Sequence, residues 1–381
     1  MKVIKISELK IGMRFSKPLM LDRDNIFLNE KVPLSESDIN RLAKFGFKEV
    51  MTLGEPIEEK QTVVGFEVKE DQNTLKIQQT FQHTIKHREE FSKIYREGFE
   101  QIQNFYRKVS EDKQPDISQL RTVGESIVDH VRSNPNVSYL LLQHHLEGYY
   151  LYNQVIRSTF YSILISQAME YSRPKMIDLS LSCLLADIGM AKIPSYVSEK
   201  TGTLNEDEYK VIMKHPLLGY QLLTKTFKLK NSLATIALQH HENYDGTGYP
   251  QKLKKQDIDE QSCIFSIADN FCALISNRPW RRKFLPYDAM KTMISVTMNK
   301  FDLNILRIFL NKISMYPIGS FVELSDGSIG QVVDTNHSKM LRPSLLIIRD
   351  LNGEIPSKEI FLNLEVDSKV YITKAIEYNI I

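Results

Sequence analysis

The sequence predicts a mainly α-helical protein with a small α+β unit at its N-terminus and a small β-rich extension at its C-terminus. Apolar residues recur at helical spacing from Thr74 to about residue 312, which is typical of packed helices. Runs with strand-like alternation stand before and after that region. The chain has 381 residues, more than the ~250 at which a single core stops growing, so we expect two or three domains.

Residues 1–54 combine strand and helix patterns. KVIKI and KEVMTL are typical of strands, and LSESDINRLAKFGF indicates a helix with Ser35 or Ser37 as its N-cap and Gly46 as its terminator. We therefore expect a small α+β domain over residues 1–54. Residues 55–73 are charged and aperiodic, which predicts a linker.

The rest of the chain divides into a helical domain over residues 74–312 and a β-rich extension over residues 313–381. TLKIQQTFQHTIKHREEFSKIYREGFEQIQNFYRKV keeps the helical period with almost no helix breakers. In SFVELSDGSIGQVVD, alternation around Asp326-Gly327 and Gly330 indicates a β-hairpin. RPSLLIIRDLNGEI and KVYITKAI add further strands.

Composition narrows the class of protein. The net charge of +2 implies no general attraction to DNA or to a membrane surface. No stretch approaches the ~18 uninterrupted apolar residues of a membrane span, and the start MKVIKISELKIGMRF lacks the apolar core of a signal peptide. We therefore expect a cytoplasmic protein with no membrane span and no DNA partner.

The three cysteines give no sign of a disulfide framework or a thiolate zinc site. Cys183, Cys263 and Cys272 are far apart and form no CxxC pair, so we expect small buried side chains. Any metal bound by this chain should have His, Asp and Glu ligands.

Five acid and imidazole side chains stand on successive helical segments. Asp187 ends LSLSCLLAD, His215 lies in VIMKHPLLGYQLL, His240 and His241 follow SLATIALQ, and Asp269 lies in CIFSIADNFCALIS. Each one alone is explained as well by a helix end, the surface or the core. Packed helices can bring such side chains to one interior site. Imidazole and carboxylate without thiolate suit Fe, Mn, Zn or Ni.

The string HHENYDGTGYP joins the paired histidines to a constrained loop. Gly246 and Gly248 permit positive φ and a close approach of the backbone, and Pro250 stiffens the exit. Tyr249 adds a ring with a polar tip. A plain connection between helices is the alternative.

A basic cluster, NRPWRRKF, follows Asp269. The guanidinium groups of Arg278 and Arg281 suit a phosphate, and the indole of Trp280 suits stacking on a base. The alternative is a solvated loop, which we favour for Arg282 and Lys283.

Four segments resemble the HD-GYP family, a branch of the HD superfamily of metal-dependent phosphohydrolases. They are LLADIGMAKIP, EYKVIMKHPLLGYQLL, HHENYDGTGYP and IADNFCALISNRPWR. The resemblance covers roughly residues 118–312 and implies an HD-type helical bundle. The flanking units look like the small N-terminal domain and the β extension that accompany this family. The family hydrolyses cyclic di-GMP at a centre of two or three metal ions, usually iron or manganese.

Carried over onto this sequence, the resemblance implies as metal ligands Asp187, His215, His240, His241 and Asp269. It implies a nucleotide contact for the GYP loop, with Gly248 and Tyr249, and for Arg278, Trp280 and Arg281. Four other positions depart from the family. Ala186 replaces the histidine of the HD pair, and Met190 replaces the lysine after it. Gln154 replaces an upstream histidine, and Tyr150 replaces a glutamate used for a third metal.

These losses fall on one side of the implied centre. We expect at most one well-held divalent ion, with Fe or Mn favoured and Zn or Ni as alternatives, or none. Hydrolysis that depends on two ions should then be impaired or absent.

Three hypotheses about function follow. The favoured one is a degenerate HD-GYP protein that binds cyclic di-GMP or a related nucleotide, or partner proteins such as a diguanylate cyclase or other signalling proteins, with little or no hydrolysis. The second is an active cyclic di-GMP phosphodiesterase with a remodelled metal site. The third is a scaffold for interactions that binds neither metal nor nucleotide.

Overall fold

The computed structural model divides the chain into two compact units, Met1–Glu67 and Val68–Ile381, which are taken in turn. The residues it describes are 2–10, 13–21, 26–28, 34, 38, 39, 42, 47–57, 72–134, 136–144, 146, 150–200, 202–277, 282–295, 298–336, 339–367 and 369–378.

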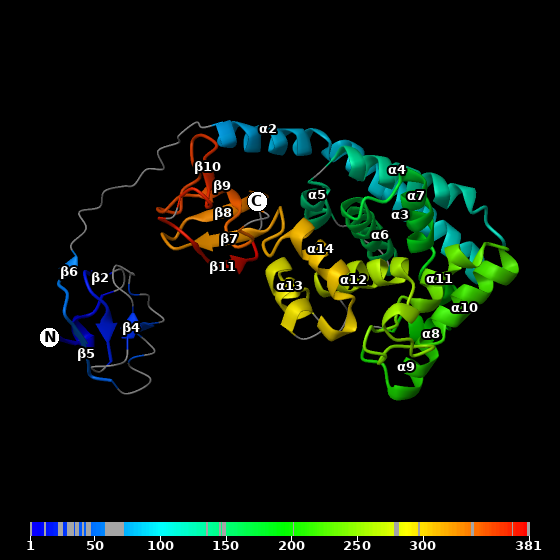
Figure 1. Cartoon of the computed structure of the whole chain (residues 1–381), viewed down its shortest axis with the longest axis horizontal. Helices are drawn as coiled ribbons and strands as arrows, with labels where there is room; N and C mark the ends of the chain where they lie inside the picture. The colour runs from blue at the N-terminus through cyan, green and yellow to red at the C-terminus, as the bar shows by residue number, and fades with distance from the viewer. Residues whose placement is uncertain are drawn as a thin grey trace. The chain divides into compact units, whose positions relative to one another are not determined.

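The first unit is built on a four-stranded antiparallel sheet of order β1-β5-β3-β4, with β2 and β6 paired separately (Figure 1). The strands predicted at KVIKI and KEVMTL are β1 and β5, which pair with Lys2 opposite Thr52. The elements are β1 Lys2–Lys5, η1 Ile6–Glu8, β2 Arg14–Phe15, β3 Leu19–Met20, β4 Ile26–Leu28, β5 Glu49–Thr52 and β6 Pro56–Ile57.

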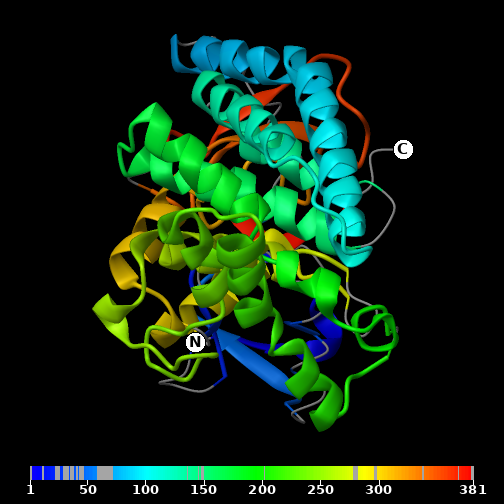
Figure 2. The ribbon, with the colours of Figure 1, turned by 90° about the vertical axis from the view of Figure 1, so that its right-hand side faces the viewer.

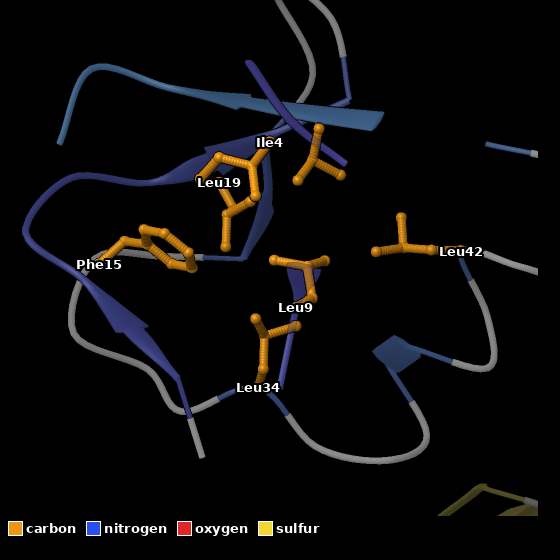
Figure 3. Packing of buried hydrophobic residues seen from close by; sticks show 7 residues of the cluster. Ile4, Leu9, Phe15, Leu19, Leu34 and Leu42 are labelled. Carbon is orange, nitrogen blue, oxygen red and sulfur yellow. The ribbon is translucent and has the colours of Figure 1, made fainter. Parts of the chain in front are cut away.

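One apolar cluster holds this unit together. Figure 3 shows its side chains meeting between the strands and the segments around Leu34 and Leu42; the cluster comprises Ile4, Leu9, Phe15, Leu19, Leu34, Leu42 and Val50. Helical backbone at Asp38, Ile39 and Leu42 lies within the predicted helix. The proposed caps Ser35, Ser37 and Gly46 lie outside the described residues, as does most of the predicted linker.

The second unit is mainly helical. Its helices up to the candidate site are α2 Gln72–Lys86, α3 Arg88–Ser110, α4 Ser118–Ser133, α5 Val137–Gln143, α6 Tyr150–Ala168 and α7 Arg173–Leu184. The following ones are η2 Ile188–Lys192, α8 Ser195–Ser198, α9 Glu206–Ile212, α10 His215–Gln221, η3 Leu222–Thr226, α11 Asn231–Gln239, η4 Lys255–Asp257, α12 Glu260–Leu274, α13 Pro286–Ser295, η5 Met298–Lys300 and α14 Leu303–Ile313.

Helix α6 is the centre of this unit. It packs against α3, α4, α7, α12 and α14, and α3 and α4 lie side by side on one face of the bundle (Figure 2). Its side chains are buried almost all round, including the polar Asn153, Gln154, Arg157 and Ser158. Buried polar groups need partners, so this helix carries hydrogen bonds into the interior.

The C-terminal strands form a five-stranded antiparallel sheet of order β10-β9-β8-β7-β11. They are β7 Phe321–Leu324, β8 Ile329–Asp334, β9 Ser344–Arg349, β10 Phe361–Asn363 and β11 Ile372–Ile376. The predicted hairpin is β7-β8, whose turn places Gly327 at φ +88°. Helix α2 packs on β8 and β10, with the Phe81 ring edge-on to Tyr139 and Phe361 (Figure 1). The sheet and the helices therefore share one compact unit.

None of the helices in the described part of the chain is both long and apolar enough to cross a membrane. The fold class predicted from the sequence, a mainly α protein with a strand-rich C-terminal region, is confirmed.

Candidate metal centre

Asp187 lies at the point where α7 gives way to the short helix η2, and only 8% of its surface is exposed. The turn runs directly against α10. A Cβ atom on Gly189 would lie 2.0 Å from the carbonyl oxygen of His215 and 2.6 Å from the amide nitrogen of Gly219. Only glycine permits this approach, which brings the carboxylate of Asp187 beside the imidazole of His215.

His215 and His240 are oriented by the backbone of the turns that precede them. Nδ1 of His215 lies 2.8 Å from the carbonyl oxygen of Ile212, and Nδ1 of His240 lies 3.0 Å from that of Ile236. A carbonyl only accepts, so each Nδ1 donates its proton and each Nε2 of the neutral ring carries a lone pair. Metal-binding histidines commonly use this arrangement.

The two Nε2 atoms and Oδ1 of Asp187 converge on one point. The Nε2 atoms are 3.1 Å apart, and they lie 3.3 Å (His215) and 3.5 Å (His240) from the carboxylate oxygen. Three acceptors this close repel one another unless a cation, either a proton or a metal ion, lies among them. The donor set therefore fits a divalent metal of the borderline class.

His241 completes a group of four. Its ring centroid lies 4.1 Å from that of His240 and 4.9 Å from that of His215, and the ring stacks on Tyr249 at 4.8 Å. The potential ligand atoms of Asp187, His215, His240 and His241 all lie within 4.8 Å of one another, so the group could hold a metal ion.

Burial and neighbouring groups shift the pKa values of Asp187, His240 and His241 in different directions. Burial opposes ionisation of Asp187, but hydrogen bonds from His215 and His240 outweigh it and hold the carboxyl pKa well below its usual range. Burial also opposes protonation of His240, but the bond to Asp187 prevails and raises its pKa. Burial, reinforced by the charge of His240 and His215, holds the pKa of His241 well below its usual range, which keeps that ring a neutral ligand.

Asp269, the fifth predicted ligand, lines the same cavity but lies outside the group of four. Its Oδ1 accepts a hydrogen bond from Nε2 of Gln154 at 2.7 Å and one from Oγ of Ser158 at 3.2 Å. Nε2 of Gln154 also donates to the backbone carbonyl of Asp269 at 2.8 Å. At this position the carboxylate is bound by neutral donors from α6.

The cavity above the group has a volume of about 780 Å³, within the range of small-molecule sites. Tyr150, Gln154 and Met190, three of the four positions that depart from the family, line it. Ala186, the fourth, is fully buried. Lys192 does not substitute for a lysine at position 190, because its ammonium donates to the carbonyl of Val109 and to Asp112.

The loop that follows the paired histidines is fixed by a residue to which the sequence pattern assigned no role. The buried carboxylate of Glu242 accepts the amide protons of Gln251 at 2.6 Å and Leu253 at 3.0 Å. Gly248 lies so close to this backbone that a Cβ atom would be 2.5 Å from Cα of Glu242, and Gly246 adopts φ +83°. The loop thereby returns to the metal group and presents Tyr249 to His241.

The basic cluster can be described only in part. Arg278, Trp280 and Arg281 lie outside the described residues. Lys283 forms an ion pair with Glu377 at 2.7 Å, with both side chains about half exposed.

Replacing Gly189 should disrupt the group without touching a ligand. We expect Gly189→Ala to lower the free energy of unfolding by about 1–3 kcal/mol and to reduce metal content, since the added methyl must push η2 away from α10. Gly202→Ala is the matched control, because its Cβ meets nothing within 4 Å. Denaturant unfolding and elemental analysis measure both effects. Equal metal content in the two variants would contradict this account of the turn.

The metal affinity should decrease as the pH is lowered. Because the pKa of His240 is raised, protons compete for its Nε2 at higher pH than at an exposed imidazole. We expect the affinity for Mn²⁺ to decrease steadily from about pH 8 to about pH 6, measured by calorimetric titration. His83→Ala, which removes an exposed imidazole elsewhere, should leave the curve unchanged. An affinity independent of pH over this range would argue against imidazole ligation.

Comparison with known families matches residues 136–305 to the HD domain and residues 321–381 to a KOW domain associated with HD domains. The chain is 32% identical over 203 residues to a cyclic di-GMP phosphodiesterase, PdeB, of Borreliella burgdorferi, covering 53% of each chain. It is 26% identical over 226 residues to the cyclic di-GMP phosphodiesterase PA4108 of Pseudomonas aeruginosa, covering 59% of this chain and 54% of the relative. The chain thus spans about half the length of the curated relatives it matches.

A solved structure shares the fold. Bd1817 of Bdellovibrio bacteriovorus, described as an HDG"Y"P protein, superposes with a TM-score of 0.50 at 16% identity, over 81% of this chain and 97% of that one. The residues matched to the HD domain include the motif segments and all four members of the Asp187-His215-His240-His241 group. Residues 136–305 are therefore an HD domain, which is the domain that defines the HD superfamily.

Proposed function

We propose that this chain is a degenerate HD-GYP protein of cyclic di-GMP signalling, which binds cyclic di-GMP or a related nucleotide in the cavity above Asp187 with little or no hydrolysis. The names of PdeB and PA4108 support the choice of nucleotide, and the size of the cavity is compatible with it. The observation that carries the loss of hydrolysis is the hydrogen bond from Gln154 to Asp269.

The four-residue group can serve one ion, but a second ion would lack donors. Gln154 stands where the resemblance implies an imidazole, and its Nε2 points at the carboxylate as a donor. Ala186 offers no donor atom at all. A cation bound to Oδ1 of Asp269 would compete with the hydrogen bonds from Gln154 and Ser158.

The remaining half-site suits binding better than turnover. A divalent ion held there would supply a Lewis acid toward a phosphate oxygen or a bound water. Asp187 and the three imidazoles would hold and orient it, while Tyr249, stacked on His241, closes that side of the cavity. The described lining residues offer no second group of ligands beside Asp269.

One observation favours the alternative of an active phosphodiesterase with a remodelled site. The group of four is intact, with Asp187, His215 and His240 buried and His241 half-buried, as a catalytic ion would require. The proposal also includes partner proteins such as diguanylate cyclases, which the resemblance implies. The loop of Asp245 and Thr247 offers exposed polar groups beside the cavity for such a contact.

Nucleotide affinity and turnover, measured on one manganese-loaded preparation, separate these functions. We expect cyclic di-GMP to bind and to be recovered intact, with any turnover at least ~10³-fold below the ~10 s⁻¹ typical of enzymes. Asp187→Asn, which removes a ligand charge, should lower metal content and nucleotide affinity together. Release of linear product at an enzyme's rate would establish the phosphodiesterase instead. Absence of both metal and nucleotide binding would leave the scaffold.

Restoring the missing donors should restore a second ion. We expect Ala186→His, Gln154→His and Met190→Lys together to raise metal content from about one toward about two equivalents per chain and to raise hydrolysis by about 10²-fold or more. The same changes combined with His215→Ala should give no such gain. A correctly folded triple variant with unchanged metal content and unchanged hydrolysis would mean that Gln154 and Ala186 do not mark the lost half-site.

A further inference from the structure

Two lysines line the cavity from segments outside all four family motifs. Lys200 precedes α9, and Lys300 is the last residue of η5. They are the two lysines among the described lining residues, which include no arginine and whose carboxylates are Asp187 and Asp269. Met190, which stands where the resemblance implies a lysine, contributes no charge to this wall.

Lys200 is held in place at the cavity wall. Its ammonium lies 2.8 Å and 2.7 Å from the two carboxylate oxygens of Glu208. Glu208 is itself fixed, because its carboxylate accepts the amide proton of Asn205 at 2.8 Å and its own amide donates to Oδ1 of Asn205 at 2.9 Å. This capping box removes much of the freedom that a lysine side chain would lose on binding a ligand.

The pair leaves Lys200 able to bind an anion. An ammonium group has three protons, and the two oxygens of Glu208 engage two of them. The side chains remain 34% and 18% exposed, so the pair contributes little to folding and its lysine is accessible. Lys300 is exposed, and its carbonyl accepts the amide proton of Tyr244 at 2.8 Å, which ties η5 to the GYP loop.

We propose that Lys200 binds a phosphate oxygen of the nucleotide in this cavity, with Lys300 as a second cation and Glu208 as the residue that positions Lys200. The inference rests on the proposed function. It identifies Lys200 as the positive charge that takes the place of the lysine that the resemblance implies at position 190, where this chain has Met190. The ligand class is a phosphodiester-containing nucleotide.

Affinity measurements at several salt concentrations test this. With manganese-loaded full-length protein, we expect Lys200→Met to weaken cyclic di-GMP binding about 10- to 100-fold, as for loss of a hydrogen bond to a charged group. The salt dependence of the affinity should also become shallower. Lys300→Met should weaken binding less. Lys210→Met is the control, because Lys210 pairs with Asp207 on the same helix and does not line the cavity.

The variant Glu208→Gln separates a ligand role from a structural one. It removes the charge that competes for Lys200 but keeps an acceptor for the amide of Asn205. If Lys200 binds phosphate, cyclic di-GMP affinity should be kept or tighten by up to about tenfold. If the pair only supports the wall, Glu208→Gln and Lys200→Met should weaken binding alike, which would overturn the inference.

The remaining outcomes are distinguishable. Wild-type protein that binds cyclic di-GMP no better than Lys200→Met overturns this inference and leaves the proposed function standing. Wild-type protein that binds no nucleotide overturns both. Inorganic phosphate is the second arm of the titration, and Lys200-dependent binding of phosphate as tight as that of the nucleotide would overturn the assignment to a nucleotide. Metal content and melting temperature should match wild type in Lys200→Met, since Lys200 is not a metal ligand.

Discussion

The meeting of His215, His240 and Asp187 constrains everything around it. Each imidazole gives its Nδ1 proton to a backbone carbonyl, so Nε2 of each ring faces the other, and Oδ1 of Asp187 faces both. Such a group of acceptors is stable only around a cation. A proton can serve, which is why the pKa of His240 is raised, and a divalent ion can replace it. The close approach of η2 to α10 and the turn at the end of α11 are the structural means of building this group.

On the other side of the cavity, the carboxylate of Asp269 is stabilised by neutral hydrogen-bond donors. Asp269 would be costly in this interior without donors. Gln154 and Ser158 supply them from α6, whereas Asn153 and Arg157, which are also buried on this helix, bond elsewhere. Oε1 of Gln154 has no hydrogen-bond partner among the described residues, whereas Nε2 donates to both the carboxylate and the backbone carbonyl of Asp269. A neutral donor at position 154 can stabilise the carboxylate but cannot ligate a metal through the same nitrogen, as an imidazole could.

Sequence patterns predicted that Asp187 and the three histidines would lie together, because the order of helices in a bundle and the motif spacing constrain where the helix ends meet. They did not predict that Asp269 accepts hydrogen bonds from Gln154 and Ser158, since these bonds join residues more than a hundred positions apart in the chain. The sequence patterns assigned no role to Gly189 or Glu242. Neither a close approach of the backbone nor a carboxylate bonded to amides produces a periodic pattern in a sequence. The amphipathic face of α2 predicted burial, but only the fold shows that it packs on the C-terminal sheet.

The proposed loss of turnover with retained binding has a simple energetic basis. Catalysis draws on interactions that are stronger in the transition state than in the ground state. In the proposed function, metal ligands at positions 186 and 154 would stabilise the charge that develops as the phosphodiester breaks. Lys200, Lys300 and an ion held by the group of four would instead bind charge that the nucleotide already carries. Removing the first set while keeping the second raises the barrier and leaves the ground-state complex largely unchanged. A chain that kept only the second set would report the presence of a nucleotide without consuming it.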